Sequence, residues 1–539
     1  MAESETQGGL VHFWNELRRR RVIRVVVLYA IAGWVVIEVA STVLPNLNLP
    51  DWSVTLVTVL VVLGFILAVI LAWAFDIGPQ GVERTPATSG AAPSRRSALS
   101  DDSLRAGEPA ADRKSIAVLP FVNMSRDEDN EYFSDGISEE ILNLLVKLPK
   151  LRVASRTSSF ALKGQNFDVP EVARRLNVDT VLEGSVRRAG DRVRITAQLI
   201  DTATDSHLWS ETYDRELKDV FAIQDDIAQS IVDALQVTLT PKERRALQYV
   251  ATSNPEAYDY YLRGRKYFYA MNSRDFQHAL RMYERAIELD PNYAIAYAGM
   301  ADTYSQIFRY ADATPKNAEK ALESSERAVA LDSDSAEAHA ARGLALFINE
   351  RYDEAERDFE TAILLNRNLF ESYYFYALSC YSQGNYEKAA RLFLRASEVN
   401  PSEYQPQAFL ALAYTSMGRD GDADAARRHT MELIERQLDL NPHDTRALYL
   451  GAAILASLAE RERALEWAER ARSAAPDEPM VLYNVACTCA VLGETDRALD
   501  LLENAIRLGW GDRAWLESDS DLDKLRGEPR FKALLQKVD

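Results

Sequence analysis

Residues 355–365 read AERDFETAILL and residues 389–399 read AARLFLRASEV, so the same small and apolar positions return after 34 residues. In each stretch an apolar residue closes the unit, and alanines stand three and ten positions before it. Alanines seven positions apart lie on one face of a helix, where their small side chains let a neighbouring helix approach closely. The two stretches therefore predict helices that stack in a regular array.

The same unit can be followed through the C-terminal half of the chain. Its closing residues are separated by steps of 42, 34, 34, 41, 34 and 34 positions, and six of the seven units carry both alanines. The fifth unit has Thr430 and Gln437 in their place. We therefore expect seven helix pairs over residues 255–510, with extra residues in two of them, and a C-terminal cap over residues 511–539. The closing residues are Leu289, Leu331, Leu365, Val399, Leu440, Ala474 and Leu508.

Several units end in Asp-Pro or Asn-Pro, and this feature together with the 34-residue period resembles the tetratricopeptide repeat (TPR) family. The ends concerned are Asp290-Pro291, Asn400-Pro401 and Asn441-Pro442. The resemblance implies an all-α TPR solenoid whose first helices line a concave groove. It also implies that the partner is a protein or a peptide.

The first helices of the first and fourth pairs are rich in aromatic residues. Tyrosine suits peptide recognition because it offers apolar area together with a hydroxyl group. Packing between helices is an alternative of equal weight for any single tyrosine, since a helix with aromatic residues all round cannot expose every one. The groove candidates are Tyr261, Phe268, Tyr374 and Tyr381.

Two long apolar runs stand near the N-terminus, at residues 25–44 and 53–75. Each has roughly the 20 residues that a bilayer-spanning helix needs. Five arginines precede the first run, whereas the link between the runs has no Lys or Arg. The positive-inside rule then predicts a two-helix transmembrane hairpin over residues 25–75 with both chain ends in the cytoplasm. The basic arm, residues 1–24, is expected to contact membrane lipid.

Glu38 falls inside the first apolar run. A charge at that depth costs roughly 2.5–3.5 kcal/mol, so the side chain is expected to be protonated or paired. One interpretation is a role in proton or signal sensing. A polar contact that holds the hairpin or an oligomer together is favoured, because neither run contains a second ionisable residue to form a relay.

The segment between the apolar runs and the repeats has two parts. Residues 76–114 are rich in Pro, Ala, Ser and Gly without apolar periodicity, which predicts a flexible linker. Residues 115–240 combine short apolar strands, a hairpin signal at Ala189-Gly190-Asp191 and amphipathic helices such as the one at 219–235. This mixture predicts one small α/β domain.

Two long motifs of this domain resemble the TolB amino-terminal-like, or FlgO-like, domain family. They are SIAVLPFVNMSRDEDNEYFSDGISEEILNLL at 115–145 and VLEGSVRRAGDRVRITAQLIDTATDSHLWSETYDRE at 181–216. In that family the domain occurs in bacterial membrane proteins that also carry TPR repeats. The resemblance therefore implies a two-pass protein of the bacterial inner membrane. Some relatives are fused to a nucleotide cyclase domain or to a DNA-binding winged helix.

Composition narrows the functional classes. A formal net charge of −19 and a pI near 5.0 disfavour nucleic acid as a partner, because such a ligand requires a basic surface. The three cysteines are an odd number, which fits a reducing compartment. We find no zinc-protease, phosphate-loop or nucleophile-elbow motif, so neither an enzyme nor a cofactor or metal is expected.

These features predict an inner-membrane-anchored scaffold or adaptor. The TPR groove would bind a partner protein, and the TolB-like domain would dock or sense; self-association into a homo-oligomer is left open. The alternative is a regulatory or ligand-sensing subunit for a separately encoded nucleotide cyclase or transcription regulator.

Overall fold

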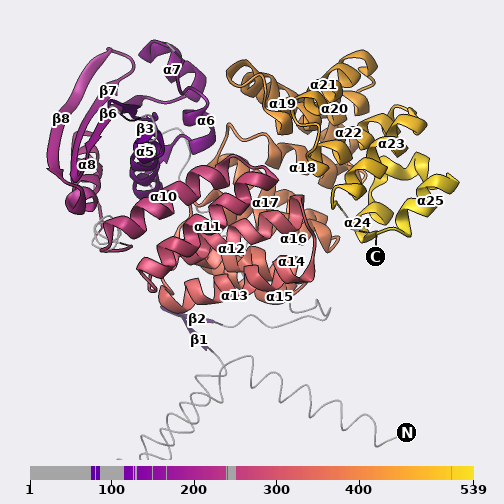
Figure 1. The fold of residues 1–539 in the computed structure, drawn as a ribbon, viewed down its shortest axis with the longest axis horizontal. Helices are drawn as coiled ribbons and strands as arrows, with labels where there is room; N and C mark the ends of the chain where they lie inside the picture. The colour runs from indigo at the N-terminus through magenta and orange to yellow at the C-terminus, as the bar shows by residue number, and fades with distance from the viewer. Residues whose placement is uncertain are drawn as a thin grey trace, which may run out of the picture. The chain divides into compact units, whose positions relative to one another are not determined.

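The computed structural model describes residues 75–78, 81–84, 114–510 and 513–538, except 126, 128–129, 149, 166, 238 and 241–250. The chain divides into two units, Met1–Ala98 and Leu99–Asp539. The first unit is described at β1 (Phe75–Gly78) and β2 (Gly81–Arg84), which form an antiparallel pair. The second unit contains an α/β domain and a helical solenoid (Figure 1).

The predicted fold class requires a correction at its N-terminal part. No helix among the described residues is long and apolar enough to cross a membrane. The longest of them, α19 (Asp420–Leu440), has 21 residues but carries nine charged side chains, which would oppose insertion. The apolar runs at 25–44 and 53–75, with Glu38, lie outside the described residues apart from Phe75. The transmembrane hairpin and the two-pass inner-membrane location are therefore not supported, and the supported fold is an α/β domain followed by an all-α solenoid.

The α/β domain is built on a mixed sheet with the strand order β5-β3-β6-β7-β8. Strand β3 runs parallel to β5 and β6, whereas β7 is antiparallel to both of its neighbours, β6 and β8. The hairpin predicted at Gly190 joins β6 to β7, and Gly190 has a φ of 61°. The strands are β3 (Lys114–Val118), β4 (Val122–Asn123), β5 (Leu151–Val153), β6 (Thr180–Ala189), β7 (Arg192–Asp201) and β8 (Ser206–Glu216).

Helices cover both faces of the parallel part of this sheet. Successive side chains of a strand point to opposite faces. Ile116 and Val118 of β3 accordingly join a core with α5 and α8, whereas Ala117 joins a second core that includes Val172 and Leu176. The first core continues into the solenoid through Tyr258, Tyr261 and Leu262, among others. The helices are α5 (Glu131–Val146), α6 (Arg156–Phe160), α7 (Val169–Leu176) and α8 (Val220–Ala234).

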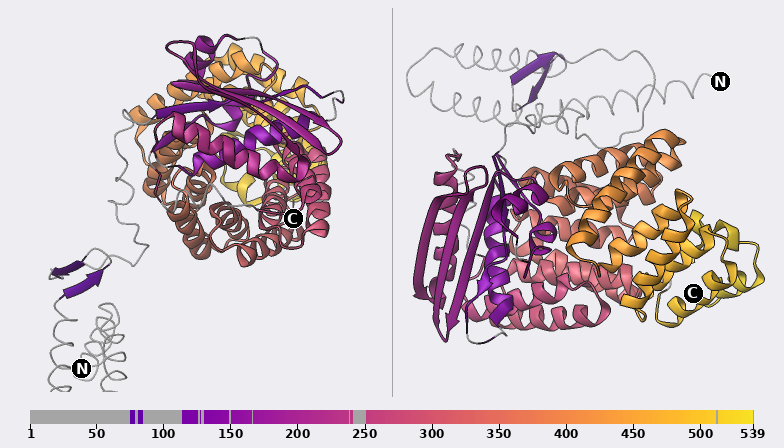
Figure 2. Two further views of the ribbon diagram at one scale, coloured as in Figure 1. Left: turned by 90° about the vertical axis from the view of Figure 1, so that its left-hand side faces the viewer. Right: turned by 90° about the horizontal axis from the view of Figure 1, so that it is seen from above.

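Within the described residues 255–507, seven antiparallel helix pairs follow, and Figure 2 shows the solenoid curving around a common centre. All twelve alanines of the repeat pattern have an exposed fraction of 0%, as close helix packing requires. The pairs are α10 (Pro255–Tyr269) with α11 (Ser273–Leu289), α12 (Ala294–Tyr310) with α13 (Pro315–Leu331), α14 (Ala336–Ile348) with α15 (Tyr352–Leu365), α16 (Phe370–Ser382) with α17 (Tyr386–Val399), α18 (Gln405–Ser416) with α19, α20 (Thr445–Ser457) with α21 (Arg461–Ala474), and α22 (Pro479–Val491) with α23 (Thr495–Arg507).

The irregular fifth pair has a simple structural cause. Helix α19 has 21 residues against 14 in α15, α17 and α21, so about two extra turns account for the longer step. The polar residues at the alanine positions are hydrogen-bonded: Thr430 donates to the carbonyl of Ala426 at 2.8 Å, and Gln437 donates to Asp444 at 2.8 Å. These bonds satisfy the polar groups, which are otherwise costly to bury.

Three short helices close the C-terminal end of the solenoid. They are α24 (Arg513–Ser518), η4 (Ser520–Leu525) and α25 (Pro529–Leu535). Leu522, Leu525 and Phe531 are buried in one core with α22 and α23. This segment therefore covers the apolar face of the last helix pair, as a cap does.

Candidate functional site

A cavity of about 1580 Å³ lies within the second unit. Its wall is formed mainly by the first helices of the repeat pairs, by the loops that lead into them, and by α5, α6 and α8 of the α/β domain. We call this cavity the lumen. Its wall carries eleven Asp or Glu side chains and six Lys or Arg side chains, so the lumen is polar and net acidic.

The lumen is enclosed because the solenoid curves back on itself. Ser273, at the start of α11, donates a hydrogen bond of 3.1 Å to Glu478, just before α22. The guanidinium of Arg446 in α20 lies over the ring of Tyr310 in α12, 5.5 Å from the ring centroid. The first two repeats therefore contact the last two, across more than 130 residues of sequence.

A buried ion triad joins the α/β domain to the solenoid. Glu139 of α5, only 3% exposed, accepts from Arg156 Nε of α6 and from Arg265 Nε of α10, both at 2.8 Å. The Arg156 guanidinium also lies 3.6 Å from the ring centroid of Tyr269. Burial raises the pKa of Glu139, but Arg265 and Arg156 outweigh this effect and hold the pKa below its usual value.

A second polar cluster repeats the contact at the other end of α10. Asp259 accepts from the hydroxyl of Tyr132 at 2.6 Å, from Arg188 at 2.5 Å and from Arg263 at 3.0 Å. The helices α5 and α10 approach closely because Gly136 has no side chain: a Cβ there would lie 2.6 Å from Leu262. Specific pairs and close packing together fix the domain against the first repeat.

One part of the lumen collects carboxyl groups with altered acidity. The pKa of Glu140 rises to about 7 because of burial and the neighbouring charge of Glu139. The pKa of Asp302 rises to about 7 because burial and Glu371 outweigh the opposing charge of Arg265. The pKa of Glu371 is raised as well, because the walls of the lumen shield its carboxyl from bulk water although the side chain faces the cavity. These groups come from α5, α12 and α16, so three elements place protonatable carboxyls in one cavity.

The raised pKa values of Glu140 and Asp302 predict a pH-dependent stability. Both carboxyls bind protons more tightly in the folded chain, so their contribution is complete below about pH 4 and is lost as the pH rises through about 7. We expect Glu140→Gln or Asp302→Asn to flatten the fall in unfolding free energy between pH 5 and 8 by roughly 1 kcal/mol or more. Urea titrations across that range measure the slope, with Glu466→Gln on the exposed face of α21 as the control. An unchanged slope in both lumen variants would contradict the assignment.

The structure separates the four predicted groove residues. Tyr261, Phe268 and Tyr374 line the lumen, whereas Tyr381 does not and instead contacts the ring of Tyr386. Tyr261 and Tyr374 are only 3% and 4% exposed, so most of each side chain packs between helices. The Tyr374 hydroxyl donates to Gln405 at 3.1 Å. Phe268 is the half-buried member that keeps surface toward the cavity.

Sequence reasoning missed the charged residues of the lumen. Arg309, Arg446, Glu140 and Asp302 follow no repeat position, and they line one cavity only because the solenoid curves and the α/β domain packs across it. The sequence of a single helix does not show which of its charged residues will share a cavity with those of distant helices. A search for charged residues on the first helices would have found three of the four.

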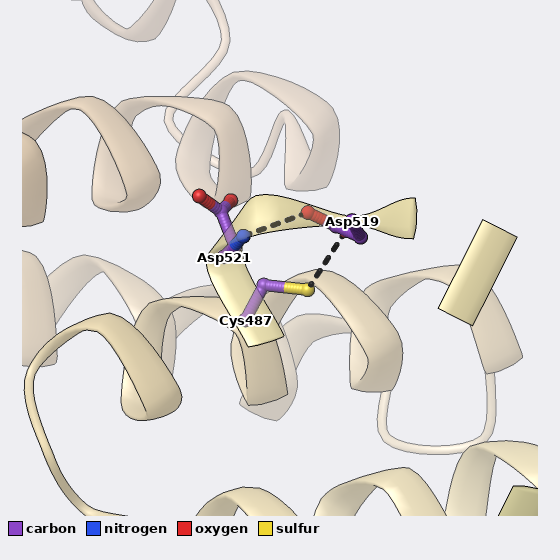
Figure 3. A group of neighbouring side chains, drawn as sticks. All are labelled: Cys487, Asp519 and Asp521. Carbon is purple, nitrogen blue, oxygen red and sulfur yellow. Dashed lines mark hydrogen bonds between the residues drawn. The ribbon is translucent and has the colours of Figure 1, made fainter. Parts of the chain in front are cut away.

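Cys487, Asp519 and Asp521 form a separate cluster beneath the C-terminal cap (Figure 3). Asp519 accepts a hydrogen bond of 2.9 Å from the backbone of Asp521, and it also accepts from the Tyr483 hydroxyl and from the Cys487 thiol. One potential ligand atom of each of these three side chains lies within 4.8 Å of the other two. Asp519 therefore serves as the N-cap of η4 and also ties the cap to Tyr483 and Cys487 of α22.

Family models match two parts of the chain. Residues 112–233 match the model of the second domain of HilA/YgeH-like transcriptional regulators. Residues 336–369 and 370–403 each match a tetratricopeptide repeat model, which confirms the predicted TPR repeats. The match of the α/β domain is thus to a regulator domain, and the expected TolB-like membership is not shown.

Individual proteins are similar over smaller shares of their length. The putative adenylate cyclase 3 of Rhizobium meliloti (strain 1021) is 44% identical over 246 residues, which are 45% of this chain and 42% of that protein. The chain therefore spans less than half of that relative. Among solved structures, MamA is 27% identical, covering 31% of this chain and 92% of its own, with a TM-score of 0.26. YrrB, described as a TPR protein with an unusual peptide-binding site, is 22% identical over 37% and 95%, with a TM-score of 0.24.

Proposed function

We propose that the protein is a non-enzymatic adaptor that binds an extended segment of a partner protein in the lumen. The size and lining of the lumen carry this proposal. Small-molecule sites usually measure about 300–1,000 Å³, whereas this cavity measures about 1580 Å³ and is lined by polar and aromatic side chains. TPR solenoids bind protein or peptide partners, and the space would accommodate several residues of a chain.

The α/β domain has the role of a docking or sensing module in this proposal. Its α5 and α6 form one wall of the lumen, and Glu139 ties that wall to α10. A ligand in the lumen would contact both parts of the chain. Movement of the domain would therefore alter the ligand's surroundings, and a TolB-like sensing role would act through this contact.

The candidate groove residues provide a matched test of the adaptor proposal. Peptides selected from a display library on the immobilised full chain are expected to bind Phe268→Ala about tenfold more weakly, since a partly exposed aromatic contact in a binding site contributes about 1–2 kcal/mol. Tyr381→Ala should leave the affinity within about twofold, because Tyr381 is equally half-buried but does not line the lumen. Fluorescence anisotropy measures both affinities. The proposal would be contradicted if the two variants lost the same affinity for the peptides. It would also be contradicted if Phe268→Ala bound the peptides as tightly as the unmodified chain.

A regulatory subunit for a separately encoded nucleotide cyclase or transcription regulator is the second candidate. The matched regulator domain at 112–233 and the 44% identity to a putative adenylate cyclase favour it. The discriminating experiment mixes the full chain with a purified candidate cyclase and measures cyclic nucleotide formation. A change in rate supports the regulatory role, whereas binding without a change in rate supports the adaptor alone. Contact with lipid, exclusion of nucleic acid and self-association stay predictions.

A further inference from the structure

Two arginines meet in the lumen from opposite ends of the solenoid. Arg309 is in the last turn of α12 and Arg446 is in the first turn of α20. Their guanidinium carbons lie 4.9 Å and 5.5 Å from the centroid of the same ring, that of Tyr310. Arg309 also lies 5.4 Å from the ring centroid of Phe375. The curve of the solenoid thus places two cations and two aromatic rings in one corner of the cavity.

These two guanidinium groups differ in their partners from those of Arg156 and Arg265, which also line the lumen. Arg156 and Arg265 share one carboxylate, that of Glu139, as an ion-pair partner. Within the described ranges, by contrast, no carboxylate forms an ion pair within 4.0 Å of Arg309 or Arg446. The nearby Glu403 accepts from the backbone and side-chain nitrogens of Gln405, at 3.3 Å and 3.2 Å.

The electrostatic consequence is visible at Tyr310. Burial alone would raise the pKa of its hydroxyl, but Arg309 and Arg446 outweigh burial and hold the pKa below its usual value. The lowered pKa of this hydroxyl indicates that the electrostatic potential in this corner of the lumen is positive. The carboxyl-rich part of the cavity begins at Asp302, seven residues earlier on α12, which is about 10 Å along the helix.

We propose that Arg309 and Arg446 form an oxyanion-binding subsite, which takes a carboxylate or phosphate group of the ligand in the lumen. Guanidinium groups bind both oxyanions through paired N–H donors. The rings of Tyr310 and Phe375 would hold the apolar part of the ligand beside the anion. The carboxyls around Asp302 would repel the same group, so the two regions set the direction in which the ligand lies. This inference rests on the proposed function and specifies which group the lumen anchors.

The test uses isothermal titration of the full chain with two probes, inorganic phosphate and hexaglutamate. We expect saturable binding of at least one probe, with at least a tenfold loss of affinity in the Arg309→Gln, Arg446→Gln double variant. Arg367→Gln, which removes another cation from the lumen wall, should change the affinity by less than twofold. The double Lys variant keeps both charges but loses the paired donors, and an intermediate loss is expected from it if the Gln variant does not fold.

The outcomes distinguish a phosphate from a peptide carboxylate as the source of the anion. They also distinguish failure of the subsite from failure of the proposed function. Binding of phosphate alone indicates a free or phosphorylated ligand, and binding of hexaglutamate alone indicates an acidic peptide; both support the subsite. Absence of saturable binding with either probe overturns it, as does an equal loss in Arg367→Gln. If the probes fail while display-selected peptides still bind the lumen, the subsite is wrong and the proposed function stands.

Discussion

Replacing Glu139 with alanine is expected to lower the unfolding free energy by about 3–5 kcal/mol, the cost of leaving buried charges without their partner. Arg156 and Arg265 both bind this carboxylate, so its removal leaves both guanidinium groups of the triad without a carboxylate partner there. The loss should appear first at the contact between α5 and α10, because those helices are joined there. Urea denaturation followed by circular dichroism measures the change, and limited proteolysis locates it.

Glu131→Ala is the matched control for this substitution, since Glu131 lies on the same helix. Its side chain is 40% exposed and pairs with Lys163. Exposed ion pairs contribute about 0–1 kcal/mol, so the unfolding free energy of the control should stay within about 1 kcal/mol of that of the unmodified chain. If Glu139→Ala costs no more than Glu131→Ala, the triad does not hold the domain to the solenoid.

Replacing Phe359 with alanine is expected to cost about 3–5 kcal/mol, as large-to-small changes of buried aromatic residues do. Phe359 in α15 is fully buried, and its ring stacks on Tyr376 with centroids 5.6 Å apart. Helix α14 approaches so closely at Gly343 that a Cβ there would lie 2.7 Å from the Phe359 ring. Such a residue couples the third pair to the fourth, and nearest-neighbour contacts carry the stability of a solenoid.

The control for Phe359→Ala is Leu364→Ala on the same helix. Leu364 is 71% exposed, so its truncation should change the unfolding free energy by less than about 0.5 kcal/mol. Equal effects in the two variants would contradict the account of the repeat core. New protease cleavage between the third and fourth pairs in Phe359→Ala would locate the lesion.

The repeat core was predictable because its signal is local. A 34-residue period and two alanines seven apart depend only on neighbouring helices, and all twelve alanines are buried. The hairpin around Gly190 was equally readable, because a turn residue and alternating burial lie within one short stretch. The insertion in α19 appeared in the sequence as a longer step, although the sequence did not show that it lengthens a helix.

The site was less predictable because it depends on contacts between residues that are far apart in the sequence. Tyr374 could be placed on a first helix, but its packing against Gln405 depends on the next repeat. Arg309 and Arg446 come together through the curvature of five repeats, and Glu139 finds Arg265 across a domain boundary. The N-terminal expectation failed differently: it rested on apolar runs and arginines alone, and the described residues contain no helix that could cross a membrane.

A photo-crosslinking measurement tests the central claim, that a partner segment binds inside the lumen. Benzoylphenylalanine is introduced at Glu371, which is exposed and lines the lumen, or at Leu394, which is 40% exposed on α17 and does not line it. A display-selected peptide is expected to crosslink to the chain modified at position 371 and not to the chain modified at position 394. Crosslinking at 394 without crosslinking at 371 would place the peptide outside the lumen and contradict the account.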